Sequence, residues 1–355
     1  MRENNTGQAS ISGNRKGLLY LAKKALREPW KLSQAMCIEL STLRILFAYG
    51  LPDVLLQLHG GIGDNLLLTV VAHELKKRNE SLKIWQVSPA ADLLQGNPDY
   101  NQVFSLRHAA LSHSNLLNSR RVLPDYNDWI IKPEIAMPPK RHIIAELCSS
   151  VGITGKISLR PYVYLTKEEK AKGSLMSKQV VFQCVGADFY SSGTYGFVGR
   201  LKLWYPDRFQ AVADKIRELR KGSRRLEIIQ LGDKNDPRIE GALDLRGRTT
   251  LRESAAILSQ SCLFVGTVGF LAHLARAVEC RSVIIFGGKE HAFQSGYECN
   301  ENIETHRACA PCWGQKPCDF GHNCMKMITT DAVVDAVKRG LARIGEPLIE
   351  EKVSL

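Results

Sequence analysis

The chain has 355 residues, of which 44% are hydrophobic, and 48 Lys and Arg against 36 Asp and Glu give a formal net charge of +12. This length exceeds the size at which one hydrophobic core usually stops growing, so two domains are expected. The basic charge predicts anionic partners, but no arginine-rich tract or interleaving of aromatic and basic residues points to nucleic acid. No signal peptide and no run of ~18–20 apolar residues is evident, so a cytoplasmic location is expected.

Residues 1–51 are predicted to form an extension before the first domain. Residues 1–14 are polar and too poor in apolar side chains to order themselves, which predicts a disordered tail. From Arg15 to Lys31, leucines and alanines alternate with basic residues at helical spacing, which indicates a basic amphipathic helix. This helix either lies on an anionic membrane surface or packs on the core with a solvated basic face. The apolar segment 43–51 either extends this module or packs on the domain that follows.

The rest of the chain alternates between strand and helix patterns, which is typical of an α/β fold with doubly wound parallel sheets. A charged segment at 167–177 precedes the second series of elements, so the junction is expected near 165–178 and the two Rossmann-like domains at 52–170 and 171–355. The predicted elements are a strand at 54–58, a helix at 64–78, a strand at 82–87, a helix at 90–94, a strand opening at 103, a strand at 179–185, a helix at 206–220, a strand at 226–231, a helix at 251–259, a strand at 263–265, a helix at 270–278 and a strand at 283–286.

A glycine-rich turn follows the first predicted strand. Gly60, Gly61 and Gly63 let backbone amides approach a ligand closely, and the helix that starts at Asp64 directs its partial positive end to the same place. The spacing is not the dinucleotide-binding fingerprint, so the glycines alone are weak evidence for a nucleotide. Asp64 is either a helix-capping residue or a carboxylate that takes a proton from an incoming hydroxyl.

Several short motifs occur in order between residues 53 and 341. They are Gly63-Asp64-Asn65-Leu66-Leu67-Leu68-Thr69, Asn97-Pro98-Asp99, Lys202-Leu203-Trp204-Tyr205-Pro206, Leu231-Gly232-Asp233 and Leu245-Arg246-Gly247-Arg248-Thr249-Thr250-Leu251-Arg252-Glu253. Together they resemble glycosyltransferase family nine, the ADP-heptose:lipopolysaccharide heptosyltransferases. The resemblance implies a GT-B arrangement of two Rossmann-like domains that face a cleft, with the acceptor on the first and the nucleotide sugar on the second. It also implies inverting transfer without a catalytic cofactor, with Asp64 at the general-base position and Gly60, Gly61 and Gly63 on the acceptor side.

The second half supplies the expected donor-binding residues. Lys202 would neutralise a diphosphate as negative charge grows on the leaving group, unless it is simply solvated. Asp233 would accept a hydrogen bond from a ribose or only form a turn. Thr249 and Thr250 would bind phosphate or ribose hydroxyls, or cap the helix that follows them.

One departure from the family pattern falls in the donor site. Family members typically carry Asp-Ser-Gly or a similar triplet before a His-Leu-Ala helix, whereas here the acidic and seryl positions are Val268 and Gly269. The amides around Gly266, Thr267 and Gly269, together with the helix N-terminus, still suit phosphate. His273 either faces the diphosphate or is a satisfied core histidine. A catalytically silent relative is the alternative that this departure suggests.

Four of the ten cysteines, Cys309, Cys312, Cys318 and Cys324, are clustered with Cys-x2-Cys-x5-Cys-x5-Cys spacing. Four thiolates in such an array suit a closed tetrahedral site, so we expect a structural Zn or Fe ion within 309–324. The alternatives are reduced thiols packed in a loop, or two disulfides. The neighbourhood also resembles the metal-binding cysteine insertion of autotransporter heptosyltransferases.

These observations predict an inverting glycosyltransferase that moves a heptose or related sugar from a nucleotide-diphosphate donor. ADP-heptose is the expected donor, and a lipopolysaccharide or other lipid-linked surface glycan at the inner membrane face is the expected acceptor. A protein O-glycosyltransferase is the alternative that the cysteine insertion suggests, and a silent nucleotide-sugar-binding relative is a further one.

Overall fold

The computed structural model describes residues 29–58, 60–126, 138–185, 201–219, 226–313, 318–345, 348 and 351–355. The predicted tail at 1–14 and all but the last residues of the predicted basic helix at 15–31 lie outside the described residues, as does His59. The first described element is helix α2, Pro29–Tyr49, which includes most of the apolar segment 43–51.

The first domain contains a four-stranded parallel sheet in the order β3-β2-β1-β4. Its buried strands follow the apolar runs predicted from the sequence, because a parallel sheet covered on both faces needs continuous apolar side chains. Its elements are β1 (Val54–Leu56), α3 (Ile62–Arg78), β2 (Ile84–Val87), β3 (Gln102–Phe104), η1 (Leu106–His108), α4 (Ala110–His113), η2 (Asn115–Arg120), β4 (Arg121–Val122), α5 (Ile143–Ser150) and β5 (Lys156–Ser158).

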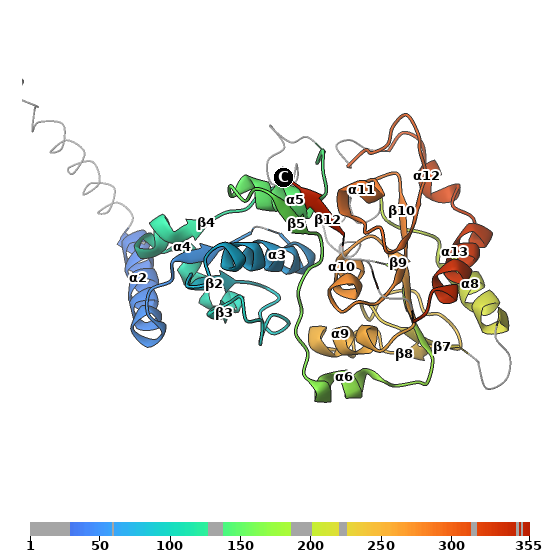
Figure 1. Ribbon diagram of the computed structural model, residues 1–355, viewed down its shortest axis with the longest axis horizontal. Coiled ribbons are helices and arrows are strands. Elements are labelled where there is room, and N and C mark those ends of the chain that lie inside the picture. The colour runs from blue at the N-terminus through green and yellow to red at the C-terminus, as the bar shows by residue number, and fades with distance from the viewer. Residues whose placement is uncertain are drawn as a thin grey trace, which may run out of the picture.

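The second domain contains a six-stranded parallel sheet in the order β11-β10-β9-β6-β7-β8, and Figure 1 shows the two sheets side by side. Its elements are α6 (Lys167–Gly173), β6 (Gln179–Gln183), α8 (Pro206–Leu219), β7 (Glu227–Gln230), β8 (Leu243–Asp244), α9 (Leu251–Ser259), β9 (Leu263–Thr267), α10 (Phe270–Ala277), β10 (Ser282–Gly287), α11 (Ala292–Ser295), β11 (Glu301–Glu304), α12 (Asn323–Lys326), α13 (Thr330–Ala342) and β12 (Lys352–Ser354).

The predicted α/β class is confirmed, and all but one of the predicted strands and helices are present within a few residues. The helix predicted at 90–94 is wrong, because Ala90–Leu94 forms only turns. The Leu94 N–H donates to the Ala90 carbonyl at 3.2 Å, and Gly96, with a positive φ of 76°, redirects the chain just beyond this bond, so the turns do not continue into a helix.

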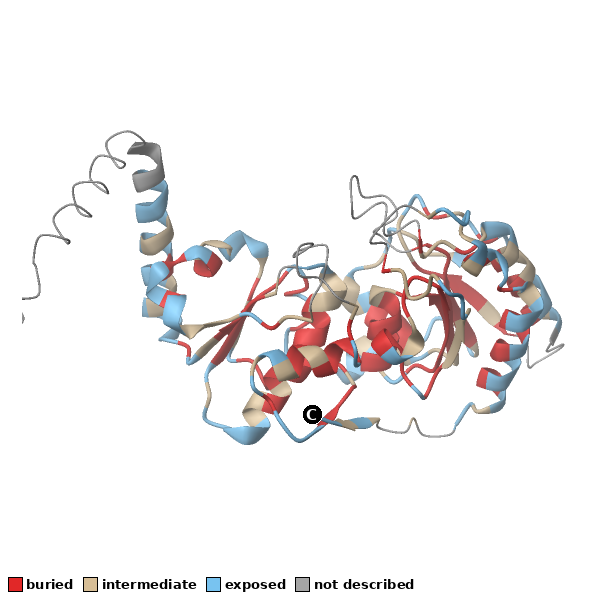
Figure 2. Ribbon diagram, turned by 90° about the horizontal axis from the view of Figure 1, so that it is seen from above, coloured by how far each residue is buried: buried red, intermediate tan, exposed pale blue. Residues whose placement is uncertain are grey.

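The two domains share their apolar packing. Leu66 and Leu93 of the first domain belong to the same buried cluster as Leu274 and Phe286 of the second. Figure 2 shows buried segments in both halves of the molecule. The predicted junction at 165–178 contains α6, which packs on α9. The last strand, β12, returns to the first half and pairs antiparallel with β5. The chain thus crosses between the two halves twice within the described residues.

Candidate active site

Hydrogen bonds from the glycine turn and from Tyr126 hold the Asp64 carboxylate in place. The Gly61 backbone N–H donates to Asp64 Oδ2 at 2.8 Å, and the Tyr126 hydroxyl donates to Asp64 Oδ1 at 2.9 Å. A Cβ at Gly60 would lie 2.6 Å from Asp64 Oδ2, so this position needs glycine. Asp64 therefore caps α3, as one of the two sequence interpretations expected. A carboxylate has about four acceptor positions, so this capping leaves room for a proton from a substrate.

The turn that carries Asp64 meets the first turn of α10 from the second domain. A Cβ at Gly63 would lie 3.5 Å from Phe270 Cα and 3.9 Å from His273 Cδ2. Residues predicted to belong to the acceptor side and to the donor side are thus neighbours. The two domains build one site at this junction.

The end of β9 and the residues before α10 form the segment that was predicted to bind phosphate. Gly266 is a packing glycine, because a Cβ there would lie 2.7 Å from Phe264 Cζ, whereas a Cβ at Gly269 would meet no atom within 4 Å. Thr267 Oγ1 is buried and has no hydrogen-bond partner in the described part of the chain. Open space at Gly269 and an unpaired hydroxyl beside the start of α10 are what a phosphate-binding helix N-terminus requires.

Lys202 lies beside a buried carboxylate that the sequence analysis missed. Its side chain is 16% exposed and its Nζ lies 4.0 Å from Glu290 Oε1, so Lys202 is not a solvated surface lysine. Glu290 also pairs with Lys289 Nζ at 3.0 Å and accepts a hydrogen bond from the Ser295 hydroxyl at 2.5 Å. Burial raises the pKa of Glu290, but Lys289, Lys202 and Ser295 together outweigh it and lower that pKa to about 2. Glu290 and Lys202 thus lie close enough to His273 to influence its pKa, which Glu290 raises and Lys202 lowers.

His273 is buried and neutral. Burial lowers its pKa to about 4, and its Nδ1 lies 2.7 Å from the Tyr297 hydroxyl. His142, from the first domain, is its electrostatic neighbour, and burial lowers the pKa of His142 to about 3. His142 Nε2–H donates to the Gly296 carbonyl at 2.9 Å, while its Nδ1 accepts from the Ile144 N–H at 3.2 Å. These partners select one neutral tautomer of His142. His273 is therefore a hydrogen-bonded core histidine that also lies at the domain junction.

Three predicted donor residues lie at another part of the same sheet edge. Asp233, just beyond β7, accepts hydrogen bonds from the backbone and side-chain N–H groups of Asn235, both at 2.9 Å. Thr250 caps α9 by accepting from the Glu253 N–H at 3.2 Å, and the Thr249 and Ser254 hydroxyls are 2.9 Å apart. The turn interpretation is correct for Asp233 and the cap interpretation for Thr250, whereas Thr249 pairs with a side chain and does not cap the helix. A nucleotide contact by any of them stays a prediction.

The cysteine-rich segment packs directly under the lysine–glutamate pair. The Cys312 N–H donates to the Gly288 carbonyl at 3.2 Å, and the Trp313 N–H donates to the Lys289 carbonyl at 2.8 Å. Lys289 Nζ also lies 4.3 Å from the centre of the Trp313 ring, a cation–π contact. A shift of the cysteine-rich segment would therefore also move Lys289, which pairs with the same carboxylate as Lys202.

The four cysteines supply the kind of donor atom, a thiol sulfur, that a zinc or iron site uses. Burial raises the pKa of Cys324, and the nearby thiols of Cys312 and Cys318 raise it further, so these three residues face one region. All four are free thiols, which excludes the two-disulfide alternative in this structure. Among the described residues, however, no three of their sulfurs come within 4.8 Å of one another. The donor chemistry fits a metal, and its presence at the cysteines stays a prediction.

A pocket of about 470 Å³ lies where His142 of the first domain meets Tyr297 of the second. It is lined by Arg141, His142, Tyr297 and Glu351, among others, and by none of the predicted site residues. We assign it no part in the reaction, because a pocket without the expected nucleophile or anion-binding groups carries no chemistry.

Sequence reasoning also missed Tyr126, His142, Tyr297 and Lys289. Lys289 and Glu290 follow β10 at once, and a charged pair directly after a buried parallel strand is a usable signal, because ligands bind outside the carboxyl ends of such strands. Around Tyr126, His142 and Tyr297, no sequence pattern indicates a functional site.

Comparison with known proteins agrees with this architecture. Residues 198–322 match the model of glycosyltransferase family 9 (heptosyltransferase), and a search of curated proteins finds no match. Among solved structures, a family 9 glycosyltransferase from Veillonella parvula is 15% identical, with a TM-score of 0.59 over 82% of this chain and 97% of that chain. The ADP-heptose lipopolysaccharide heptosyltransferase II of E. coli is 13% identical, with a TM-score of 0.57 over 82% and 99%. The iron-containing dodecameric glycosyltransferase TibC of enterotoxigenic E. coli is 16% identical, with a TM-score of 0.59 over 81% and 76%.

The two Rossmann-like domains have the GT-B fold of these solved structures, and the match to the family model supports a glycosyltransferase. The predicted resemblance to glycosyltransferase family 9 is confirmed by the match over the second domain, which includes Lys202, Asp233 and His273.

Proposed function

We propose that this enzyme transfers a heptose or related sugar from a nucleotide-diphosphate donor, with ADP-heptose as the leading candidate, to a lipopolysaccharide or other surface glycan. The observation that carries the proposal is the approach of Gly63, next to Asp64, to Phe270 at the start of α10, because a helix N-terminus suits the phosphates of a donor. The solved structure of TibC with ADP-D-β-D-heptose supports the choice of donor.

The chemistry follows from this arrangement. Asp64 takes the proton of the acceptor hydroxyl, whose oxygen attacks the anomeric carbon while the bond to the diphosphate breaks on the opposite face. The configuration of the sugar is inverted. Lys202 stabilises the negative charge that the departing diphosphate acquires, and Glu290 holds Lys202 in position.

Donor screening tests this proposal. Thermal-shift measurements with ADP-, GDP- and UDP-sugars should show stabilisation by an ADP-sugar, since a ligand that binds only the folded state stabilises it by mass action. Mass spectrometry of reactions with ADP-heptose and a truncated lipopolysaccharide should then show one added heptose. A shift without product from any acceptor would favour the silent relative, and no shift with any nucleotide sugar would contradict the proposal.

A protein acceptor is the second candidate. The cysteine segment packed beneath Lys289 supports it, as does the fold likeness to TibC, which is described as iron-containing. Incubation with ADP-heptose and either lipopolysaccharide or unfolded polypeptides separates the two acceptors by the mass of the product.

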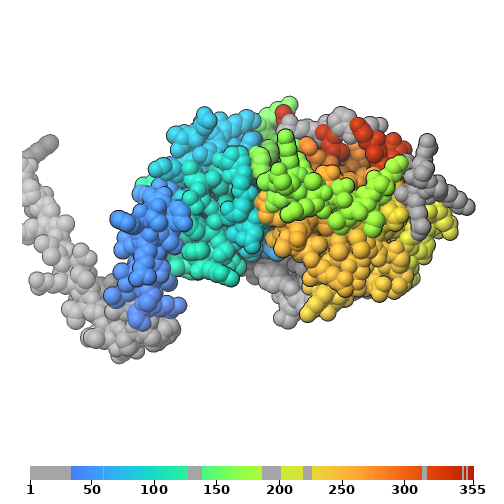
Figure 3. Space-filling view, turned by 90° about the horizontal axis from the view of Figure 1, so that it is seen from below, coloured from blue at the N-terminus to red at the C-terminus, as the bar shows by residue number. Residues whose placement is uncertain are grey.

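Helix α2 supports a membrane-bound acceptor. Met36, Leu40, Leu43 and Phe47 recur at helical spacing on one face and are 58%, 55%, 49% and 96% exposed. On the flank of α2 that contacts the first domain, Glu39 accepts hydrogen bonds from Asn115 N–H at 2.8 Å and from the Ser114 hydroxyl. Figure 3 shows α2 standing at the outer end of the first domain. No helix among the described residues is long and apolar enough to cross a bilayer.

We propose that this apolar face of α2 lies on a lipid surface, with the basic residues between 15 and 31 next to anionic headgroups. Binding to vesicles that contain phosphatidylglycerol should fall when Leu43 and Phe47 are changed to Asp. Vesicle binding that is unchanged in this variant would contradict the proposal. So would a variant that binds vesicles as before but no longer self-associates, because the apolar face would then contact a second copy of the chain.

A further inference from the structure

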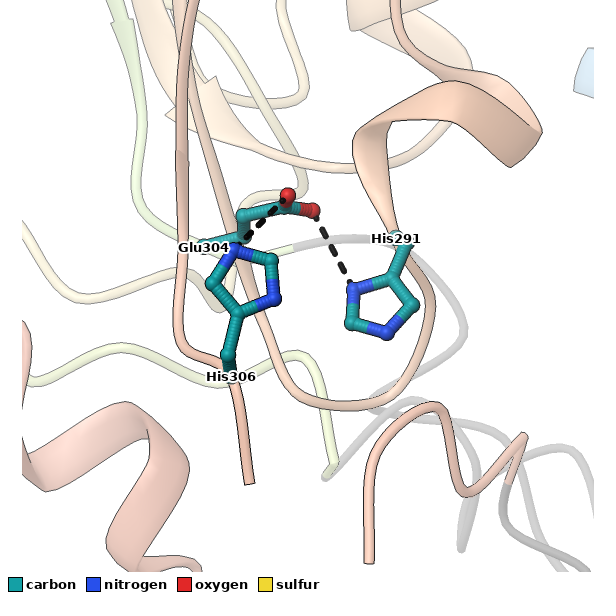
Figure 4. Close-up of side chains that lie close together, drawn as sticks. All are labelled: His291, Glu304 and His306. Carbon is teal, nitrogen blue, oxygen red and sulfur yellow. Dashed lines mark hydrogen bonds and ion pairs between the residues drawn. The ribbon is translucent and has the colours of Figure 1, made fainter. Parts of the chain in front are cut away.

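Three metal-binding side chains gather at the edge of the second sheet, outside the cysteine array and outside the transfer site. His291 precedes α11, Glu304 is the last residue of β11, and His306 follows two residues later. Their ligand atoms all lie within 4.8 Å of one another. Figure 4 shows the Glu304 carboxylate between the two imidazole rings.

The distances in this group are those between ligands of one ion. His291 Nδ1 lies 3.3 Å from Glu304 Oε2, and His306 Nε2 lies 3.5 Å from Glu304 Oε1. Both exceed the usual 2.9–3.0 Å of an N–H···O bond. Ligands about 2.0–2.1 Å from a tetrahedral metal are roughly 3.3 Å from each other. The spacing therefore suits a shared cation better than two direct hydrogen bonds.

The carboxylate is held in place by the backbone. The Ala292 N–H donates to Glu304 Oε2 at 2.7 Å, and a hydrogen bond of this kind orients a metal-binding carboxylate. Within the described residues, the ion pairs of Glu304 are with these two histidines and with no lysine or arginine. The side chains of His291 and Glu304 are 14% and 22% exposed, while that of His306 is 77% exposed, so an ion has a route from solvent.

We propose that His291 Nδ1, His306 Nε2 and the Glu304 carboxylate bind one divalent transition-metal ion of the Zn²⁺ or Fe²⁺ class. Two imidazole nitrogens and one carboxylate are a donor set that these borderline ions accept, with water completing the coordination. The ion would fasten the turn after β10, where Glu290 lies, to the end of β11. This site is independent of the cysteines and goes beyond the proposed function.

Anaerobic Co²⁺ binding to the full chain tests the site, because the two classes of ligand give different spectra. Cobalt bound by thiolates has a strong near-ultraviolet charge-transfer band, whereas cobalt bound by imidazole and carboxylate does not. We expect a variant with His291→Asn and His306→Asn to bind about one Co²⁺ fewer per chain with the thiolate band unchanged. His306→Asn alone, at an exposed position, should weaken the same binding without disturbing folding.

His73→Asn is the matched control. His73 Nδ1 lies 3.1 Å from Asp99 Oδ2, a histidine–carboxylate pair that is not part of a three-ligand group. This variant should keep the cobalt binding of the unmodified chain. Equal cobalt binding by the double variant and the unmodified chain would overturn the proposal. Loss of the thiolate band together with the ion would overturn it as well, because the cobalt would then belong to the cysteines.

Discussion

The Tyr126 hydroxyl, from the segment after β4, donates a hydrogen bond to Asp64 Oδ1 at 2.9 Å, across 62 positions of sequence. With the Gly61 N–H on Oδ2, this bond fixes both the position and the rotation of the carboxylate. A general base needs such a fixed direction, because proton transfer depends on its reach to the substrate hydroxyl. In the proposed mechanism, the same bonds would serve both folding and catalysis.

Asp64→Asn separates the two roles. Asparagine can still accept from the Gly61 N–H, so the cap and the stability of α3 should be kept within about 0.5 kcal/mol. Because the amide cannot take a proton, we expect kcat for sugar transfer to fall about 10²–10⁴-fold. Steady-state kinetics and urea unfolding measure the two effects. Transfer within tenfold of the unmodified enzyme would show that Asp64 is only a cap. Tyr126→Phe, which loses one bond but keeps the base, should cost far less.

Glu290→Gln tests the buried charge cluster. Removing the carboxylate leaves Lys202 and Lys289 without this partner, and breaking a buried ion pair costs about 3–5 kcal/mol. Glu301→Gln is the control, because its partner Arg339 is 59% exposed and such a pair contributes about 1 kcal/mol or less. Denaturant unfolding compares the two. Equal losses would mean that the buried cluster contributes no more than a surface pair.

The Glu290 carboxylate also makes the free energy of unfolding depend on pH in the acidic range. The pKa of Glu290 is lowered from 4.5 to about 2 on folding, so its contribution is present above 4.5 and is lost as the pH falls from there toward 2. Between pH 4.5 and pH 3, the free energy of unfolding of the unmodified chain should therefore fall more steeply than that of Glu290→Gln. A parallel decline of the two proteins would contradict this assignment.

The buried histidines make the free energy of unfolding depend on pH in a higher range than Glu290 does. The folded pKa of His273 is about 4, below its ordinary value of 6.5, so the unfolded chain binds the proton first and stability falls as the pH drops from 6.5 to 4. Each such histidine contributes about 1.4 kcal/mol per pH unit in this range. His273→Gln should flatten the decline measured by urea unfolding at pH 7, 6 and 5. Substitution of the exposed His113 should leave the slope unchanged, and equal slopes for all three proteins would refute the assignment.

Trp313 couples the cysteine segment to the site. Its Nε1–H donates to Gln294 Oε1 at 3.1 Å, and its ring covers the Lys289 ammonium. Trp313→Ala should cost about 3–5 kcal/mol and weaken donor binding, because Lys289 loses its neighbour. Trp313→Phe keeps the ring face and should cost about 1–2 kcal/mol, for one buried hydrogen bond. Calorimetric titration with the donor gives the affinity. Unchanged donor affinity in the folded Ala variant would separate the segment from the site.

Much of the fold was predictable because its signals are local. The apolar run at 54–58 and the glycines after it indicate a buried strand and a turn, and the helical spacing that follows indicates α3. The turn at Ala90–Leu94 was misread as a helix because five residues carry too little periodicity. The capping roles of Asp64 and Thr250 were also predictable, since such residues commonly occur at helix starts.

The sequence by itself determined the order of the strands and helices along the chain, the glycine turn, the cysteine array and the resemblance to family 9. These are patterns of neighbouring residues, and the backbone responds to them locally. The tertiary structure alone decided that Lys202 lies beside Glu290 and that Gly63 lies against Phe270. It also brought the ligand atoms of His291, Glu304 and His306 within 4.8 Å of one another. Contacts of this kind depend on how the sheets and helices pack, and no spacing along the chain encodes them.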